Sequence, residues 1–173
     1  MKPSGYKYAE IERERRFLCN EVPVLSGDVH QSRIEDVYYP GKSLRLRKVT
    51  HLRTGQVDYK FTQKLQDTDD LKRRILTTFY VPEETYGFLL QLPGGQLISK
   101  VRHHWEGTGL ALGVDEFHGP LKGLFVFEIE FNTDNEMNAY EPPGFVTREI
   151  SDVAELTCGV LAGKSLTDIR HLL

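Results

Sequence analysis

Charged side chains in this sequence recur at every second residue over several short segments. Glu12 and Glu14 show this spacing near the N-terminus, and Arg45 and Arg47 show it further along the chain. The other charged positions with this spacing are Glu10, Arg16, Lys60, Lys64, Lys100, Arg102, Glu128 and Glu130. Residues i and i+2 of an extended strand project from the same face, so each segment would carry one strongly charged face.

Two interpretations of these faces are open. Charged residues at every second position are common on the solvent-exposed side of a sheet. Several of these segments, however, carry only positive charge, such as Arg45 with Arg47 and Lys100 with Arg102, and like charges on neighbouring strands repel one another. If the charged faces instead point into a closed barrel, they need countercharges, ions and water there, because an unpaired buried charge is costly.

A charged interior of this kind suits a particular class of ligand. Cations on several walls favour a multiply charged anion, and a polyphosphate fits because arginine offers a bidentate fork and lysine a point charge. The acidic segments would repel phosphate unless a divalent cation lay between them. Oxygen ligands favour Mg²⁺ or Mn²⁺, which also bridge to phosphate oxygens. The spacing therefore predicts a metal-dependent polyphosphate site.

The elements that must position these residues are mostly strands. Segments rich in β-branched and aromatic residues follow one another at short intervals, separated by turn signals such as Pro40-Gly41. We expect strands at residues 6–18, 29–39, 43–51, 57–64, 73–81, 96–105, 110–117 and 124–131. Helices are expected over residues 83–91 and from residue 151 or 152 to about 163. Many short antiparallel strands with few helices predict a barrel or a sandwich, and a barrel leaves no exposed edge.

Composition narrows the class of protein further. A length of 173 residues predicts one domain, spanning residues 1–173. The 22 basic and 25 acidic residues give a net charge of −3, whereas nucleic-acid-binding proteins normally carry a basic excess. Residues 1–5 lack the apolar run of a signal peptide, and Cys19 and Cys158 match no metal or disulfide spacing. We therefore expect a cytoplasmic monomer or homodimer that acts on a small molecule and contacts neither nucleic acid nor membrane.

Several motifs resemble those of the CYTH family, also called triphosphate tunnel metalloenzymes. Residues 12–18, which read ERERRFL, resemble its N-terminal ExExK signature. Segments 45–47 (RLR), 61–64 (FTQK), 97–102 (LISKVR) and 114–131 follow in the family's order. The resemblance implies a mainly β (α+β) fold: a closed eight-stranded antiparallel β-barrel, or tunnel, with a few peripheral helices. It also implies a charged lumen that binds a triphosphate.

The resemblance further implies roles for individual residues. Positions that match the acidic motifs would be catalytic carboxylates and metal ligands, namely Glu12, Glu14, Glu128 and Glu130, with Asp115 as a further metal ligand. Positions that match the basic motifs would hold phosphate oxygens, namely Arg16, Arg45, Arg47, Lys64, Lys100 and Arg102. Additional substrate-binding candidates, in or beside the charged segments, are Lys60, Arg74 and Arg148.

Departures from the family pattern leave alternatives open. Arg16 stands where the signature has lysine, which keeps the charge but changes the geometry, and Leu76 and Thr78 replace two carboxylates of an RxExE strand. The leading interpretation is a triphosphatase, a phosphoanhydride hydrolase that uses Mg²⁺ or Mn²⁺ and acts on inorganic tripolyphosphate or a small organic triphosphate. The alternatives are a class IV-type adenylyl cyclase and a non-catalytic polyphosphate- or nucleotide-binding module.

Overall fold

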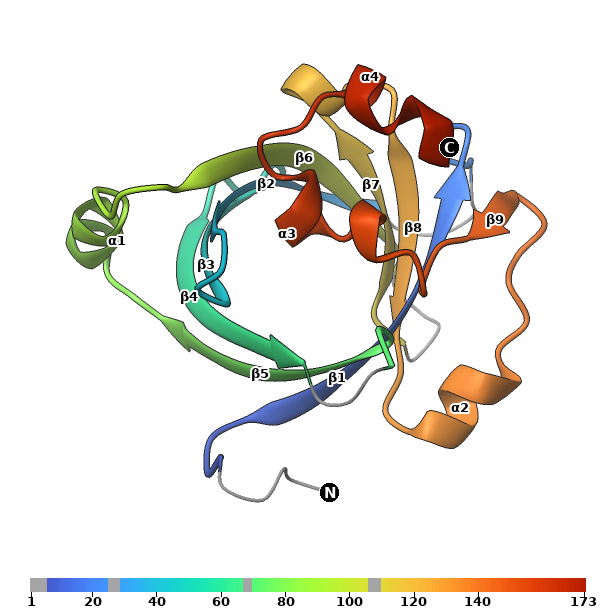
Figure 1. Cartoon of the computed structure of the whole chain (residues 1–173), viewed down its shortest axis with the longest axis horizontal. Coiled ribbons are helices and arrows are strands. Elements are labelled where there is room, and N and C mark those ends of the chain that lie inside the picture. The colour runs from blue at the N-terminus through green and yellow to red at the C-terminus, as the bar shows by residue number, and fades with distance from the viewer. Residues whose placement is uncertain (1–5, 25–28, 67–69, 106–109) are drawn as a thin grey trace.

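The main feature of the computed structural model is a closed β-barrel (Figure 1). The structure describes residues 6–24, 29–66, 70–105 and 110–173, so residues 1–5, on which the signal-peptide prediction rests, lie outside it. The strands are β1 (Glu10–Cys19), β2 (Val29–Tyr39), β3 (Leu44–His51), β4 (Val57–Gln66), β5 (Arg73–Tyr80), β6 (Gln96–Trp105), β7 (Leu112–Phe117), β8 (Phe125–Glu130) and β9 (Val146–Glu149). The first eight follow the antiparallel order β5-β4-β3-β2-β6-β7-β8-β1, and pairing of β5 with β1 closes the ring. The predicted fold class is confirmed.

Strand β1 closes the barrel by sharing its edges among three strands. Its first four residues pair with β5 and the next six pair with β8. Strand β9, which the sequence analysis did not predict, pairs with the end of β1 on the edge that β5 has left. Because side chains alternate along a strand, this register places Glu12, Glu14 and Arg16 on the lumen side and Phe17 on the outer side.

The helices are short and lie outside or across one end of the barrel. They are α1 (Glu83–Leu89), α2 (Asp134–Ala139), α3 (Cys158–Leu161) and α4 (Leu166–Ile169), with 3₁₀ turns at Gly119–Leu121, Ala154–Leu156 and Arg170–Leu172. The prediction of α1 is confirmed. The long helix expected near the C-terminus is interrupted, because Thr157 has an extended backbone (φ −75°, ψ 143°) between a 3₁₀ turn and α3. No helix in the described residues is long and apolar enough to cross a membrane.

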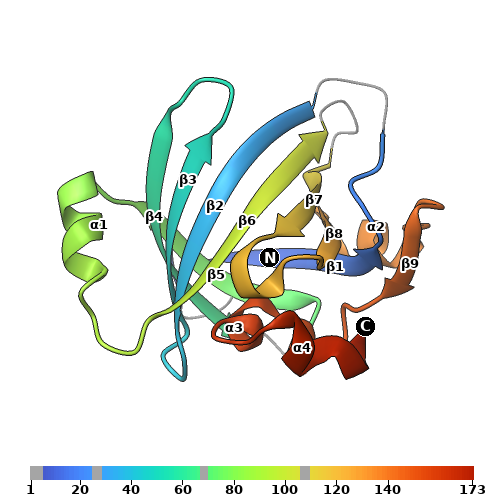
Figure 2. The ribbon, with the colours of Figure 1, turned by 90° about the horizontal axis from the view of Figure 1, so that it is seen from above.

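Apolar side chains pack around the barrel and across one end of it, which leaves the lumen to polar groups. One cluster, containing Phe17 and Phe127, lies on the outer face beneath α2. A second cluster, containing Leu156 and Leu161, joins the C-terminal segment to the end of the barrel. A third places Leu46 beneath α1. Figure 2 shows α3 and α4 side by side at that end.

Candidate active site

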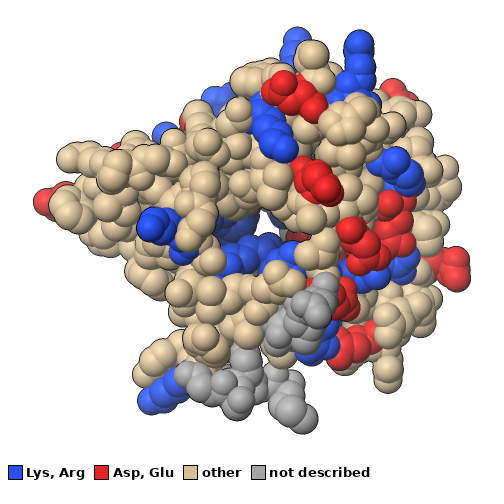
Figure 3. Space-filling view, in the orientation of Figure 1, with Lys and Arg blue, Asp and Glu red and all other residues tan. Residues whose placement is uncertain are grey.

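The barrel encloses a cavity of about 590 Å³. In the space-filling view, Lys and Arg side chains border a small opening at the centre of the molecule (Figure 3). The charged positions predicted from the sequence that line the cavity are Glu12, Glu14, Arg16, Arg45, Arg47, Lys60, Lys64, Arg74, Lys100, Arg102, Glu128 and Glu130. Asp115 and Arg148 are not among the lining residues. The charged faces of the strands therefore point into the lumen rather than to the outer surface.

Three glutamates converge on the wall formed by β1 and β8. Carboxylate oxygens of Glu12, Glu14 and Glu130 lie within 4.8 Å of one another, because Glu14 and Glu130 are direct partners in the β1–β8 pair. Burial, together with repulsion from Glu128 and Glu12, raises the pKa of Glu14 to about 8. A cation placed beside this carboxyl group would offset both effects and favour its ionised form. This oxygen donor set fits Mg²⁺ or Mn²⁺.

Asp115 and Glu128 differ from Glu14 and Glu130, because short contacts with Arg102 and Lys100 neutralise their charge. The Nε of Arg102 donates to Asp115 at 2.6 Å, and its Nη2 donates to Glu128. Lys100 donates to Asp115, and both of these side chains are fully buried. Although burial opposes ionisation of Glu128, Lys100, Arg102 and Arg16 hold its pKa well below the usual range. Asp115, the direct strand partner of Arg102 on the same face of the sheet, thus anchors two lumen cations, and Glu128 is the counterion of one of them.

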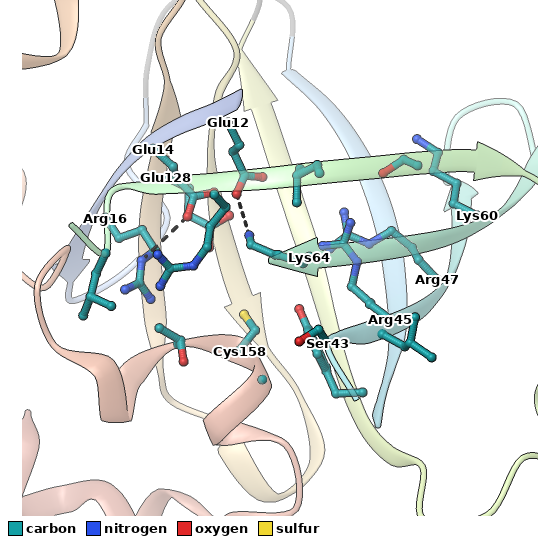
Figure 4. Close-up of a pocket in the computed structure, with 18 of the residues that line it drawn as sticks. Glu12, Glu14, Arg16, Ser43, Arg45, Arg47, Lys60, Lys64, Glu128 and Cys158 are labelled. Atoms are coloured by element: carbon teal, nitrogen blue, oxygen red, sulfur yellow. Dashed lines mark ion pairs between the residues drawn. The ribbon is translucent and has the colours of Figure 1, made fainter. Parts of the chain in front are cut away.

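The wall formed by β3 and β4 carries cations across the lumen from the glutamates (Figure 4). Arg45 donates from Nη2 to the Thr62 hydroxyl at 3.3 Å, but its buried Nε has no hydrogen-bond partner among the residues that the structure describes. The Lys60 ammonium lies 4.9 Å from the centre of the Tyr80 ring and has no carboxylate partner in the described part of the chain. An unpartnered buried donor is costly. Arg45 and Lys60 are therefore the cations most available to an incoming anion.

Two further lumen cations are bound by carboxylates. Both Nε and Nη2 of Arg47 donate to Asp36, at 2.6 and 2.7 Å, and Lys64 lies 2.5 Å from a carboxylate oxygen of Glu12. Asp36 is fully buried, and Arg47 outweighs the effect of burial, so that the pKa of Asp36 falls to about 2. The sequence analysis missed Asp36. Aspartate is uncommon inside strands, and this was the signal that could have identified it.

Two arginines are held by the main chain instead. Arg16 donates from Nη1 to the carbonyl oxygen of Leu156 at 2.8 Å, and Arg74 donates from Nη1 to the carbonyl oxygen of Arg73 at 2.8 Å. Arg148 lies on β9, outside the cavity, where it donates to the carbonyl oxygen of Leu172. The bond from Arg16 ties the C-terminal segment to the lumen wall.

The C-terminal segment itself lines one side of the lumen, which the sequence analysis did not predict. Thr157, Cys158 and Gly159 all border the cavity. The sulfur of Cys158 lies 3.9 Å from the Nζ of Lys100, and burial raises the pKa of this thiol. Cys158 therefore contributes a neutral group to an otherwise charged wall.

Known proteins share both sequence and fold with this chain. No family model matches it. The curated inorganic triphosphatase of Acetivibrio thermocellus is 25% identical over 144 residues, covering 81% of this chain and 85% of the relative. The crystal structure of the inorganic triphosphatase NE1496 matches with a TM-score of 0.57 and 22% identity, over 87% of this chain and 93% of that one. The chain therefore shares its fold with this solved structure.

A second solved structure has the same fold. The crystal structure of a putative adenylate cyclase from Bacillus halodurans matches with a TM-score of 0.51 and 14% identity, over 76% of this chain and 86% of that one. At this identity the likeness concerns the fold alone. The barrel fold expected from the sequence is thus confirmed, whereas the roles of individual lumen residues in this chain stay predictions.

Proposed function

We propose that this protein is a metal-dependent triphosphatase, which hydrolyses a phosphoanhydride bond of a triphosphate held in the lumen. The observation that carries the proposal is the division of one closed lumen into an acidic wall and a basic wall. Glu12, Glu14 and Glu130 lie on the first, and Arg45 and Lys60 lie on the second. The relative named inorganic triphosphatase supports the same activity.

In this proposal the two walls bind different parts of the ligand. Glu12, Glu14 and Glu130 would hold Mg²⁺ or Mn²⁺, which when bound supplies positive charge beside the phosphate oxygens. Arg45 and Lys60 would bind the non-bridging oxygens and orient the chain of phosphates. Charge on these oxygens is most of what phosphoryl transfer must accommodate. The enclosing barrel strengthens each contact, because it limits bulk water around the ligand.

Phosphate release from a panel of substrates tests this function. The panel is tripolyphosphate, pyrophosphate, ATP and thiamine triphosphate, each with Mg²⁺, with Mn²⁺ and with EDTA. We expect phosphate release from at least one triphosphate in the presence of metal and none with EDTA. Metal-dependent binding without turnover would support a non-catalytic module instead, and formation of a cyclic nucleotide from ATP would support a cyclase.

A matched pair of variants connects the activity to the acidic wall. Glu14→Gln removes one carboxylate from the cluster and should abolish metal-dependent turnover. Glu116→Gln, on the outer face of β7, removes a glutamate that does not line the cavity and should leave turnover unchanged. Full activity of Glu14→Gln would contradict the assignment of this carboxylate.

The choice of metal, the oligomeric state and the location of the protein also belong to this proposal. Cys19 and Cys158 are both free thiols, which supports a reducing compartment such as the cytoplasm. A small triphosphate or polyphosphate remains the proposed ligand, bound by a monomer or a homodimer.

A further inference from the structure

A second cavity, of about 740 Å³, contains polar side chains that the proposed triphosphatase does not use. Ser32 on β2, His51 on β3 and His104 on β6 line it. Figure 2 shows β2 beginning and β6 ending at the end of the barrel that lies away from α3 and α4. In the described part of the chain the two cavities share no lining residue, so the second cavity can be considered as a separate site.

Strand register places a serine, a histidine and an aspartate in a row. Ser32 and His51 are direct partners in the β2–β3 pair, and Asp58 on β4 pairs with Val49, two residues before His51. Directly opposed residues share a face of the sheet, and so do residues two apart on one strand. The three side chains therefore lie on one face of three neighbouring strands. It is the inner face, because Arg47, four residues before His51, lines the main cavity.

Hydrogen bonds connect these three side chains in the order that nucleophilic catalysis requires. The Nδ1 of His51 lies 3.4 Å from the Ser32 hydroxyl, and its Nε2 lies 3.0 Å from one carboxylate oxygen of Asp58. Gln56 donates to the other carboxylate oxygen at 3.2 Å. The bond from His51 lowers the pKa of Asp58, so at neutral pH this carboxylate is ionised and can only accept. The Nε2 of His51 therefore carries the ring proton, and Nδ1 is left to accept the proton of the serine hydroxyl.

This arrangement has the three roles of a catalytic triad: a nucleophile, a base and a group that orients the base. The contact between nucleophile and base is often longer before a substrate is bound than during the reaction, which accommodates the 3.4 Å between Ser32 and His51. Ser32 is only 3% exposed, yet it lines the cavity. A substrate must therefore enter the cavity to reach the hydroxyl, and it meets little bulk water there.

His104 supplies a neutral hydrogen-bond donor beside Ser32. It lies two residues beyond Arg102, the direct partner of Ser32 in the β2–β6 pair, which is a diagonal separation of about 7–8 Å that long side chains can span. Burial, together with the charge of Arg102, lowers the pKa of His104 to about 4, so at neutral pH one ring nitrogen donates and the other accepts. Such a donor stabilises the negative charge that develops on a carbonyl oxygen during acyl transfer.

We propose that Ser32, His51 and Asp58 form a serine hydrolase site, which cleaves small carboxylic esters in the second cavity. The Oγ of Ser32 would bond to the carbonyl carbon while its proton passes to Nδ1 of His51. The ester C–O bond then breaks, and the alcohol leaves with that proton. Water next attacks the acyl-serine and gives a proton to His51, which returns it to the Ser32 oxygen as the carboxylic acid leaves. This activity is separate from the proposed triphosphatase.

A fluorophosphonate probe, which reacts covalently with activated serines, tests this site directly. The wild-type protein is treated with the probe in EDTA, and mass spectrometry of its peptides locates the modified residue. Hydrolysis of p-nitrophenyl acetate is measured alongside. We expect modification at Ser32 and saturable ester hydrolysis. Ser32→Ala should abolish this modification and lower kcat/KM for the ester at least about a hundredfold. The matched variant Ser99→Ala, on the outer face of β6 and outside both cavities, should react as the wild type does.

The contrary results are equally specific. The inference is overturned if the probe does not modify Ser32 in the wild type, or if Ser32→Ala hydrolyses the ester as fast as the wild type. If Ser32→Ala does not fold, His51→Gln replaces it, because the side chain of His51 is 41% exposed. This variant should slow modification of Ser32 about a hundredfold, and an unchanged rate would also overturn the inference. The assays contain EDTA and no triphosphate, so their outcome is independent of the triphosphatase proposal.

Discussion

Two arginines on β3 show how far residue spacing alone can predict a site. The spacing of Arg45 and Arg47 correctly placed both side chains in the lumen. It did not reveal that Asp36 binds two nitrogens of Arg47, Nε and Nη2, or that the Nε of Arg45 has no partner among the described residues. Asp36 lies on another strand, and the register between strands is not contained in the spacing along either one. Single-strand patterns therefore predict which face a residue occupies but not its partner.

Arg45→Ala should weaken triphosphate binding more than monophosphate binding. Arg45 is a lumen cation without a carboxylate partner in the described chain, so its loss removes a charge-assisted contact that only an extended anion can reach together with the acidic wall. We expect a loss of about tenfold or more for tripolyphosphate, measured by calorimetric titration, and little change for orthophosphate. Arg33→Ala, from the exposed outer face of β2, is the control. Equal losses for the two anions would contradict the assignment.

Asp36 makes a contribution to the free energy of unfolding that depends on pH. Its pKa in the folded protein is about 2, below the ordinary value of 3.8, because of Arg47. A carboxyl group with a depressed folded pKa stabilises the fold above its unfolded pKa and loses that contribution as pH falls towards the folded value. Asp36→Asn should therefore be less stable than the wild type by about 2 kcal/mol at pH 7. Urea unfolding should show this difference shrinking between pH 3.8 and 2, and a difference that does not depend on pH would count against the ion pair.

At the scale of elements, the strands were predictable and the C-terminal segment was not. The eight barrel strands are long enough to show their alternating pattern, whereas α2, α4 and β9 have only four to six residues each. So short a segment does not establish a period. The predicted C-terminal helix fails at Thr157, where the chain extends and α3 then borders the lumen. This position depends on contacts with Arg16, about 140 residues earlier, which no local pattern records.

Packing of α3 on the end of the barrel should depend on Leu161. This side chain is 1% exposed within the cluster that joins the C-terminal segment to the barrel. Leu161→Ala should lower the free energy of unfolding by about 2–4 kcal/mol, through lost burial and the cavity left behind. Val160→Ala, its neighbour in sequence but 41% exposed, should cost about 1 kcal/mol or less. Chemical denaturation compares the two, and equal losses would show that α3 is not held by this contact.

In most small domains apolar side chains fill the interior and charged side chains cover the outside, and this molecule reverses that arrangement. Its apolar clusters lie around the outside and one end of the barrel, and its interior is lined by charge. Many of the lumen charges are paired within the protein, among them Glu12 with Lys64. The raised pKa values of Glu14 and Glu130 show that these two carboxyl groups are not balanced in this way, and the Nε of Arg45 has no hydrogen-bond partner among the described residues. Unbalanced buried charge destabilises the fold. Ligands that supply the missing charges should therefore stabilise the whole barrel.

Divalent cations should raise the melting temperature of the protein through the acidic wall. Binding at a hundred times the dissociation constant contributes about 2.7 kcal/mol, which for a chain of this size corresponds to roughly 5–10 °C. Thermal unfolding with Mg²⁺, with Mn²⁺ and with EDTA measures the shift. Glu14→Gln should lose most of it, because the cluster of Glu12, Glu14 and Glu130 is left with two carboxylates. Glu116→Gln, on the outer face, should keep the full shift. An equal shift in Glu14→Gln and the wild type would mean that the stabilising ion binds elsewhere, and the acidic wall would then need another explanation.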